Sequence, residues 1–247
     1  MNAASHRWTS DTSTLFPSVV NPPEVVTDAL SRLRQSPDLS VKHTHRFTKT
    51  VQIDFGAHFT LLDVGCALGD AIKHFSMRAP NASLFGMDIS RTAIERCRKD
   101  LGGIASFEVG DIRSIKGRYD IIFCSHVLEH FSDFECLGRE LAAHCSRLCI
   151  MTPYRELRDG RPLVPDPTEP HQSTLDDNSF DFLVREGLAE EITTYVMRCP
   201  GAWGCGFSGR VKERIKNLIR PFLGKPGWRD NRQIIYDIRI KAQDIST

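Results

Sequence analysis

From residue 60 onward, short apolar runs alternate with stretches whose apolar residues recur at helical spacing. This alternation of buried strands with helices is typical of a layered α/β fold with a mostly parallel sheet. Such sheets bind ligands at the carboxyl ends of their strands. The predicted strands are residues 60–64, 83–88, 106–109, 119–124, 147–152, 191–197 and 232–241. The predicted helices are residues 70–78, 91–98 with Ser90 as N-cap, 134–143 and 178–186.

The 247 residues allow one large domain with appendages. We expect residues 1–50 to be an N-terminal extension, with a short helix that follows Pro22-Pro23 and ends at Ser36-Pro37. Residues 51–247 are expected to form the main domain. Two long connections, 152–178 and 199–231, do not fit a minimal sheet, and loops of this length are usually functional.

Charge and composition exclude several classes of protein. Lys and Arg number 32 against 31 Asp and Glu, so a strongly cationic nucleic-acid coat protein is excluded, although a local basic patch is not. No apolar run reaches the roughly 18 residues of a membrane span, and the polar start of the chain does not resemble a secretory signal. We therefore expect the eight cysteines to be reduced and the protein to be cytoplasmic.

The strongest local signal is LLDVGCALGD at residues 61–70, where a predicted strand leads through small residues into a helix. Small residues let a ligand approach the backbone, and the helix N-terminus offers free N–H donors. A tight turn without a ligand is the simpler alternative. The spacing Gly65-x-Ala67-x-Gly69 differs from the dinucleotide pattern G-x-G-x-x-G. Asp63 beside the loop would repel a pyrophosphate and attract an ammonium group.

Two further acids follow the next two predicted strands. Asp88 ends the second strand, where an acid in nucleotide-binding folds accepts hydrogen bonds from a ribose diol. Asp111 follows the third strand and could receive an adenine amino group. With Asp63, these acids describe a ligand that has an amine, a ribose and an adenine but no phosphate. That ligand is S-adenosylmethionine (SAM).

On these residues, the sequence resembles the class I SAM-dependent methyltransferases over about residues 55–200. The matching segments are LLDVGCALGD, LFGMDIS, FEVGDI and YDIIFCSHVLEHF. The resemblance implies a doubly wound, Rossmann-like sheet of seven strands, with helices on both faces and an antiparallel last strand. By this resemblance, the methionine moiety is held by Asp63, Gly65, Cys66 and Gly69. The ribose is held by Asp88 and Ile89, and the adenine by Asp111 and Ile112.

Two more residues belong to this expected cofactor site. Ala67 stands where the family usually has glycine, and we expect it to fit there with a negative φ. Ser125 lies at the end of the fourth strand, which is expected beside the sulfonium.

The segment HVLEH at residues 126–130 follows that fourth strand and supplies the candidate catalytic residues. Methyl transfer requires an aligned nucleophile and, for a hydroxyl or protonated amine, removal of a proton. An imidazole can take that proton at neutral pH, so His130 is the candidate general base. His126 is a candidate wall of the acceptor pocket or an alternative base. In the simpler alternative, Glu129 and His130 cap the next helix and hold the loop.

A metal-binding alternative uses the same segment. His126, Glu129 and His130 have i, i+3, i+4 spacing, and His171 lies beyond the fifth strand. This resembles the metal-dependent RNA 3′-terminal 2′-O-methyltransferases, which use E-x-x-E-H and a distant histidine; His126 replaces their first Glu. Imidazoles with one carboxylate would suit a transition metal better than magnesium. Small-molecule and glycan methyltransferases of this fold also place a histidine in the acceptor cleft, and we favour that role for His171.

The insertion at residues 199–231 contains a basic stretch, 210–220, with an apolar side. One interpretation is an amphipathic helix on the sheet edge. The other is contact with an anionic acceptor, such as a sugar nucleotide or RNA, or with a membrane surface. The basic residues concentrated here are Arg210, Lys212, Arg214, Lys216, Arg220, Lys225, Arg229 and Arg232. The flanking aromatic residues, which suit core packing better than stacking on a ligand, are Trp203, Phe207, Phe222 and Trp228.

The sequence therefore predicts a SAM-dependent methyltransferase that acts on oxygen or nitrogen of a small molecule or glycan. The alternatives are a metal-dependent RNA 2′-O-methyltransferase and a non-catalytic SAM-binding module. An NAD-dependent dehydrogenase fits less well because of Asp63 and the loop spacing.

Overall fold

The computed structural model describes residues 37–158, 161–166, 168, 170–198, 215 and 232–242. Its centre is a seven-stranded sheet with the strand order β3-β2-β1-β4-β5-β9-β8. The strands of this sheet are β1 (Thr60–Val64), β2 (Ser83–Asp88), β3 (Ser106–Val109), β4 (Tyr119–Ser125), β5 (Cys145–Pro153), β8 (Ala189–Arg198) and β9 (Arg232–Ile240).

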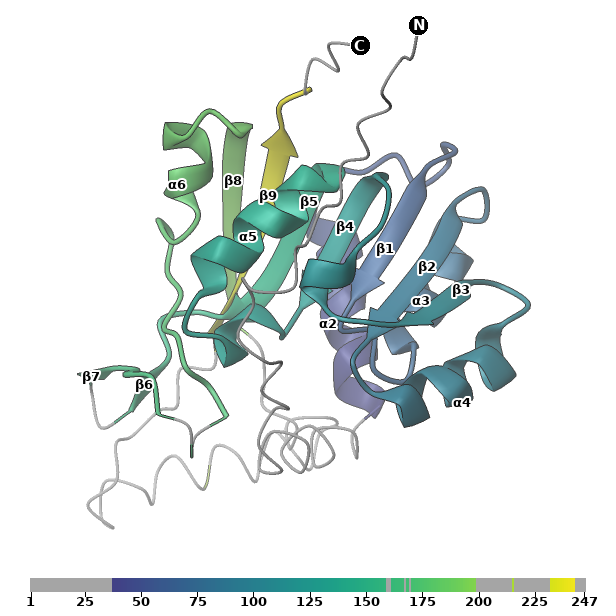
Figure 1. The fold of residues 1–247 in the computed structure, drawn as a ribbon, viewed down its shortest axis with the longest axis horizontal. Coiled ribbons are helices and arrows are strands. Elements are labelled where there is room, and N and C mark those ends of the chain that lie inside the picture. The colour runs from purple at the N-terminus through teal and green to yellow at the C-terminus, as the bar shows by residue number, and fades with distance from the viewer. Residues whose placement is uncertain are drawn as a thin grey trace, which may run out of the picture.

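The sheet is mixed but mostly parallel. Strands β1 to β5 are parallel to one another, whereas β9 is antiparallel to both β5 and β8. Figure 1 shows β9 pointing opposite to β1 and β2. The predicted α/β class, the seven strands and the antiparallel last strand are confirmed.

Helices cover both faces of the sheet, as predicted. In Figure 1, α5 lies in front of the sheet and α2 and α3 lie behind it. Among the described residues, no helix combines the length and the hydropathy that a bilayer span requires. The helices and 3-10 turns are α2 (Pro37–Thr50), α3 (Asp70–Arg78), α4 (Arg91–Leu101), η1 (Ile112–Ser114), η2 (Leu128–His130), α5 (Phe134–Ala143) and α6 (Asp181–Arg185).

The period-2 alternation of a strand explains how both faces become apolar. In β4, Ile121 and Phe123 pack in a core cluster with α2, α3 and α4. Their neighbours Ile122 and Cys124 pack on the other face with α5 and α6. All four side chains are buried, as expected for a central parallel strand.

Helix α2 was not predicted from the sequence. Pro37 opens α2, because proline is tolerated in a first helical turn, and the helix end predicted at Ser36-Pro37 belongs to a helix outside the described residues. Phe47 of α2 is fully buried against Phe75 and Phe123, so α2 contributes to the same core as the sheet. The helix expected after Pro22-Pro23 lies outside the described residues, and the boundary at residue 50 stays a prediction.

The connection between β5 and α6 is folded onto the site edge of the sheet. It contains a two-stranded sheet of β6 (Leu157–Arg158) and β7 (Arg161–Pro162). The N–H groups of Gln172 and Ser173 donate to the carbonyl of Glu129, at 2.7 and 3.2 Å. These two bonds hold the second half of the connection against η2.

Candidate functional site

The carboxyl ends of β1, β2, β3 and β4 lie at one edge of the sheet because these strands are parallel. The loop of residues 65–69 follows β1, and Asp88 ends β2. Asp111 follows β3, and Ser125 ends β4. The expected cofactor residues therefore meet where the connections from neighbouring strands β1 and β4 diverge, the usual ligand position in such sheets.

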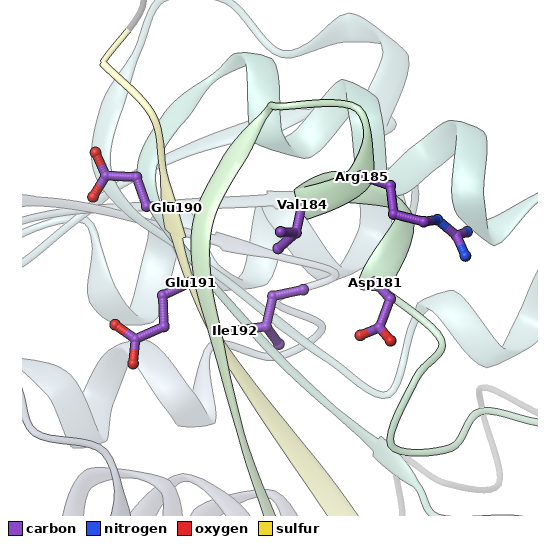
Figure 2. A pocket seen from close by; sticks show the side chains of 6 residues that line it. All are labelled: Asp181, Val184, Arg185, Glu190, Glu191 and Ile192. Atoms are coloured by element: carbon purple, nitrogen blue, oxygen red, sulfur yellow. The ribbon is translucent and has the colours of Figure 1, made fainter.

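A cavity of about 430 Å³ lies elsewhere, between α6 and β8 (Figure 2). The cavity lies at the start of β8, and β8 runs parallel to β5 because both are antiparallel to β9. The cavity is therefore at the edge where the parallel strands begin, whereas the glycine loop is at the edge where they end. None of the expected site residues lines it. The lining residues are Asp181, Val184, Arg185, Glu190, Glu191 and Ile192.

The glycine loop is held against β2 and needs glycine at its start. The N–H groups of Gly65 and Cys66 both donate to the carbonyl of Met87, at 2.8 and 3.0 Å. Gly65 has φ +76°, and a β-carbon there would lie 2.3 Å from Cγ2 of Val127. Gly69 has φ +77° and precedes the first turn of α3. Both glycines therefore meet a backbone or packing requirement that other residues cannot satisfy without strain.

The expectation of a negative φ at Ala67 is wrong: its φ is +48°. A β-carbon in the left-handed region costs about 1–2 kcal/mol. Two contacts keep Ala67 in this conformation. Its N–H donates to Oδ2 of Asp88 at 2.9 Å, and its carbonyl accepts from the Cys97 thiol at 3.3 Å. The loop thus adopts the conformation of a glycine here despite the alanine.

Asp63 is buried beneath this loop with an unsatisfied oxygen. Its side chain is 3% exposed, and Oδ2 has no hydrogen-bond partner. Burial and, to a lesser extent, the nearby charge of Asp88 raise the pKa of Asp63 well above its usual range. A buried oxygen atom without a hydrogen-bond donor costs free energy of folding. A bound ammonium group would supply the donor that Oδ2 of Asp63 lacks.

Asp88 joins β2 to the loop and to the next helix. Its Oδ2 accepts from the N–H of Ala67, and its Oδ1 accepts from the N–H of Ser90 at 2.8 Å. A carboxylate has about four lone-pair positions, so each oxygen can accept one more bond, as from a ribose diol. The next residue, Ile89, is 47% exposed and offers an apolar surface beside it.

Asp111 begins η1 through a capping box. Its Oδ1 accepts from the N–H of Arg113 at 2.9 Å, and its own N–H donates to Oγ of Ser114 at 3.0 Å. The N–H of Gly110 donates to the carbonyl of Asp88 at 3.1 Å, which ties the ends of β2 and β3 together. The side chain of Ile112 is 4% exposed and packs in the core, so its assignment to the adenine stays a prediction.

His126 lies just beyond β4 with both ring nitrogens engaged. Its Nδ1 lies 3.1 Å from Oε1 of Glu129, and because an ionised carboxylate only accepts, the proton is on Nδ1. Its Nε2, 3.0 Å away, then accepts from the amide nitrogen of Gln233. The same amide lies 3.1 Å from Nε2 of His43, whose ring stacks on His126 at 4.8 Å. His126 is thereby held by α2 and β9.

Glu129 is a buried carboxylate that stays ionised. Burial alone would raise its pKa, but the hydrogen bond from His126 and the proximity of the His126, His130 and His171 imidazoles outweigh burial and lower the pKa to about 2. Its Oε2 has no hydrogen-bond partner, although the side chain is only 1% exposed.

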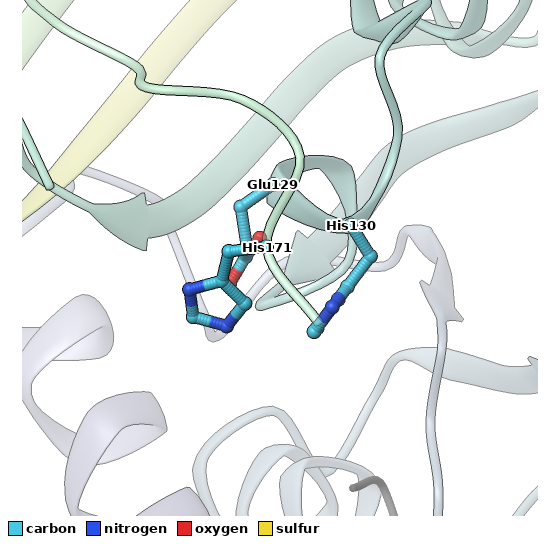
Figure 3. A group of neighbouring side chains, drawn as sticks. All are labelled: Glu129, His130 and His171. Atoms are coloured by element: carbon cyan, nitrogen blue, oxygen red, sulfur yellow. The ribbon is translucent and has the colours of Figure 1, made fainter. Parts of the chain in front are cut away.

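His130 and His171 lie close to this carboxylate (Figure 3). Nδ1 of His130 donates to the carbonyl of Pro170 at 2.6 Å, and its buried Nε2 has no hydrogen-bond partner. Nδ1 of His171 lies 2.5 Å from Oε2 of Glu156. The two imidazole rings are 4.8 Å apart and nearly perpendicular.

A family model described as a methyltransferase domain matches residues 61–148, which run from β1 into β5. Residues 61–148 therefore form part of a methyltransferase domain. The model covers the glycine loop, the acids after β2 and β3, and the segment HVLEH.

Two curated relatives match this methyltransferase domain. Trans-aconitate 2-methyltransferase of Deinococcus radiodurans is 26% identical over 84 residues, which are 34% of this chain and 33% of the relative. Malonyl-acyl-carrier-protein O-methyltransferase of Legionella pneumophila is 29% identical over 86 residues, 33% of this chain and 30% of the relative. The match therefore spans about a third of the length of each relative.

Solved structures of methyltransferases share the fold. Coclaurine N-methyltransferase, solved with N-methylheliamine and S-adenosylhomocysteine (SAH), superposes with a TM-score of 0.56 at 14% identity. The alignment covers 81% of this chain and 72% of that one. The aligned share of this chain is larger than the part that the family model matches.

Three residues around the candidate site were not predicted from the sequence. They are His43 of α2, Gln233 of β9 and Glu156 of the connection after β5, and each contacts a predicted histidine. His43 and Gln233 are 190 positions apart, and neither lies in a motif. The prediction that His171 belongs to the acceptor side stays a prediction, but the structure does bring it beside His130.

The basic insertion contributes little to the described site. Of its expected cationic residues the structure describes Arg232, whose guanidinium lies 5.0 Å from the ring centroid of Tyr154. The other cationic residues and the flanking aromatic residues lie outside the described residues, so their role stays a prediction. These are Arg210, Lys212, Arg214, Lys216, Arg220, Lys225, Arg229, Trp203, Phe207, Phe222 and Trp228.

Proposed function

We propose that this chain transfers a methyl group from SAM to oxygen or nitrogen of a small-molecule or glycan acceptor. The observation that carries the proposal is the buried carboxylate of Asp63, with an unsatisfied oxygen beside a loop that admits only glycine at Gly65. A ligand with an ammonium group would satisfy Asp63, whereas the phosphates of a dinucleotide would be repelled by it.

The remaining loop residues fit the rest of SAM. Asp88 retains lone pairs for the ribose hydroxyls, and Ile89 offers an apolar surface for the nucleoside. Asp111 lies on the next strand end and would accept from the adenine amino group. When bound, SAM supplies an activated methyl group, and the protein orients the acceptor for in-line attack.

The acceptor side is formed by the histidines after β4. His126 has both nitrogens engaged, so it would orient the loop and the acceptor rather than take a proton. His130 offers the lone pair of Nε2, which can accept a proton or bind a cation. Oxygen and nitrogen acceptors are supported by the names of the related proteins, which include an O-methyltransferase and an N-methyltransferase.

RNA as the acceptor and a non-catalytic SAM-binding role are the alternatives. The RNA alternative rests on the pattern of His126, Glu129, His130 and His171 and on the basic insertion, most of which lies outside the described residues. The non-catalytic alternative is disfavoured because the candidate histidines lie at the end of β4, on the same edge as the glycine loop.

The test is isothermal titration of the full chain with SAH. We expect micromolar binding by the wild type and a tenfold to hundredfold loss in Asp63→Asn, because a charge-assisted hydrogen bond contributes about 1.5–3 kcal/mol. Asp100→Asn is the matched control: Asp100 is an exposed acid of α4 paired with Arg96, and its variant should bind within twofold of the wild type.

Thermal unfolding without ligand shows whether a loss of binding reflects unfolding. Asp63→Asn replaces a buried ionisable group with a neutral one of similar shape, so the variant should be at least as stable as the wild type. Absence of SAH binding by the wild type, or stabilisation by NAD instead, would contradict the proposal.

A further inference from the structure

Glu129, His130 and His171 form a cluster of possible metal ligands on the acceptor side of the site. One ligand atom from each lies within 4.8 Å of the other two. Figure 3 shows Glu129 and His130 coming from η2 and His171 from the connection that crosses it. The bonds from Gln172 and Ser173 to Glu129 fix that crossing.

Two polar atoms of these side chains are buried without a hydrogen-bond partner. They are Oε2 of Glu129 and Nε2 of His130. Each unsatisfied buried polar atom costs about 1–3 kcal/mol, and more when it is charged. Both atoms offer lone pairs, so the missing group is a donor or a cation. A single small cation held between these two atoms would satisfy both of them.

Each side chain of the cluster is oriented by an outer partner. Nδ1 of His130 donates to the Pro170 carbonyl, which leaves a lone pair on Nε2. Nδ1 of His171 faces the carboxylate of Glu156, so its lone pair is also on Nε2. Oε1 of Glu129 accepts from His126. Metal-binding histidines usually have such a carbonyl or carboxylate partner, which fixes the tautomer.

We propose that Glu129, His130 and His171 bind one divalent transition-metal ion. Two imidazoles and one carboxylate suit Zn²⁺, Fe²⁺ or Co²⁺ rather than Mg²⁺, which prefers an all-oxygen set. Metal–nitrogen distances of about 2.0–2.1 Å place tetrahedral ligands about 3.3 Å apart. The three atoms lie within 4.8 Å, so side-chain adjustments of about an ångström would close the site.

His126 is not a ligand in this arrangement, in contrast to the four-residue pattern seen in the sequence. Its two nitrogens face Glu129 and Gln233. The ion would keep open positions, where an acceptor oxygen could be oriented and made more acidic. This catalytic role rests on the proposed function, but the binding of the ion does not.

The test uses the full chain after removal of metals with a chelator, titrated with Co²⁺ and followed by visible absorption and calorimetry. We expect one Co²⁺ per chain, competition by Zn²⁺ and no competition by equimolar Mg²⁺. His171→Ala and Glu129→Gln should each weaken Co²⁺ binding at least a hundredfold. Glu156→Gln, which removes only an outer partner, should weaken it about tenfold to a hundredfold.

His144→Ala is the matched control. His144 also faces a carboxylate, Glu140 at 3.4 Å, and donates to the carbonyl of Gly117, but it is not part of the cluster. Its variant should bind Co²⁺ within twofold of the wild type. Circular dichroism checks folding, and His171→Ala remains informative if Glu129→Gln does not fold, since the His171 side chain is 23% exposed.

Undiminished Co²⁺ binding in both ligand variants, or no binding by the wild type, would overturn the metal site. SAH titration of the same proteins separates this result from the proposed function. If the wild type binds SAH but no metal, the proposed methyl-transfer function stands and only the metal site is rejected. Metal binding with the expected variant pattern but no SAH binding supports the site and removes its role in methyl transfer.

Discussion

Substitution of Gly65 by alanine should destabilise the protein through two separable costs. Gly65 has φ +76°, and a β-carbon there would lie 2.3 Å from Cγ2 of Val127. The left-handed backbone costs an L-residue about 1–2 kcal/mol, and overpacking costs about 1–3 kcal/mol. The reduced freedom of the unfolded chain returns about 0.4–1 kcal/mol. The net loss is about 3 kcal/mol, or roughly 6–12 °C in the unfolding midpoint for a chain of this size.

Gly117→Ala isolates the backbone cost. Gly117 has φ +78°, but a β-carbon there would meet nothing within 4 Å. The expected loss is about 1 kcal/mol, from the left-handed conformation alone. The difference of about 2 kcal/mol between the two variants therefore measures the overlap with Val127.

Urea unfolding at constant pH provides the free energies of both variants and of Gly65→Ala combined with Val127→Ala. Removing Cγ2 should relieve the overlap, so the double variant should be about 1–3 kcal/mol more stable than the sum of the single losses predicts. Equal losses in Gly65→Ala and Gly117→Ala, or strict additivity with Val127→Ala, would refute the close approach of the loop and the segment after β4.

Two further predictions concern Ala67 and His43. Ala67→Gly should stabilise the protein by about 0.5–1 kcal/mol, because relief of the left-handed alanine exceeds the added freedom of the unfolded chain; a lower unfolding temperature would contradict this. Burial, and then the charges of His126 and Arg46, lower the pKa of His43 to about 3, although Glu129 opposes the shift. The folded protein therefore keeps His43 neutral, whereas the unfolded chain protonates this histidine below about pH 6.5. The free energy of unfolding consequently decreases as pH falls below that value. Between pH 7 and pH 5, the free energy of unfolding measured in urea should fall by about 2 kcal/mol more in the wild type than in His43→Gln. Equal decreases in the two proteins would show that His43 does not cause the pH dependence.

The strands were predictable because each contains a short stretch rich in apolar and β-branched residues between turn residues. β4 is an example, and its predicted range is extended only by Ser125. Helix α6 is shorter than predicted because residues 176–179 form a turn instead. In that turn, Oγ of Ser179 accepts from the N–H of Asp176, and a carboxylate oxygen of Asp176 accepts from the N–H of Asn178. Such local side-chain bonds compete with a helix and are hard to weigh from periodicity alone.

The site was predictable where it depends on strand ends and not where it depends on long-range pairing. Asp63 and Asp88 follow directly from the strands that carry them. Gln233 reaches His126 across 107 positions and His43 across 190, and no motif marks such contacts. The conformation of Ala67 was not predicted because alanine rarely adopts a positive φ. Contacts such as the hydrogen bond from its N–H to Asp88 keep Ala67 in that conformation, and the sequence does not reveal them.

The buried polar atoms that lack partners are concentrated at one edge of the described sheet. Asp63 is near the end of β1, Thr152 near the end of β5, and Gln233 near the start of the antiparallel β9, which lies at the same edge. Glu129 and His130 extend this group beyond β4. The left-handed, non-glycine residues Ala67, His126 and Arg155 lie there too. Folding alone gains nothing from unsatisfied atoms and strained backbone in the same place, so this edge is where binding must offset their cost.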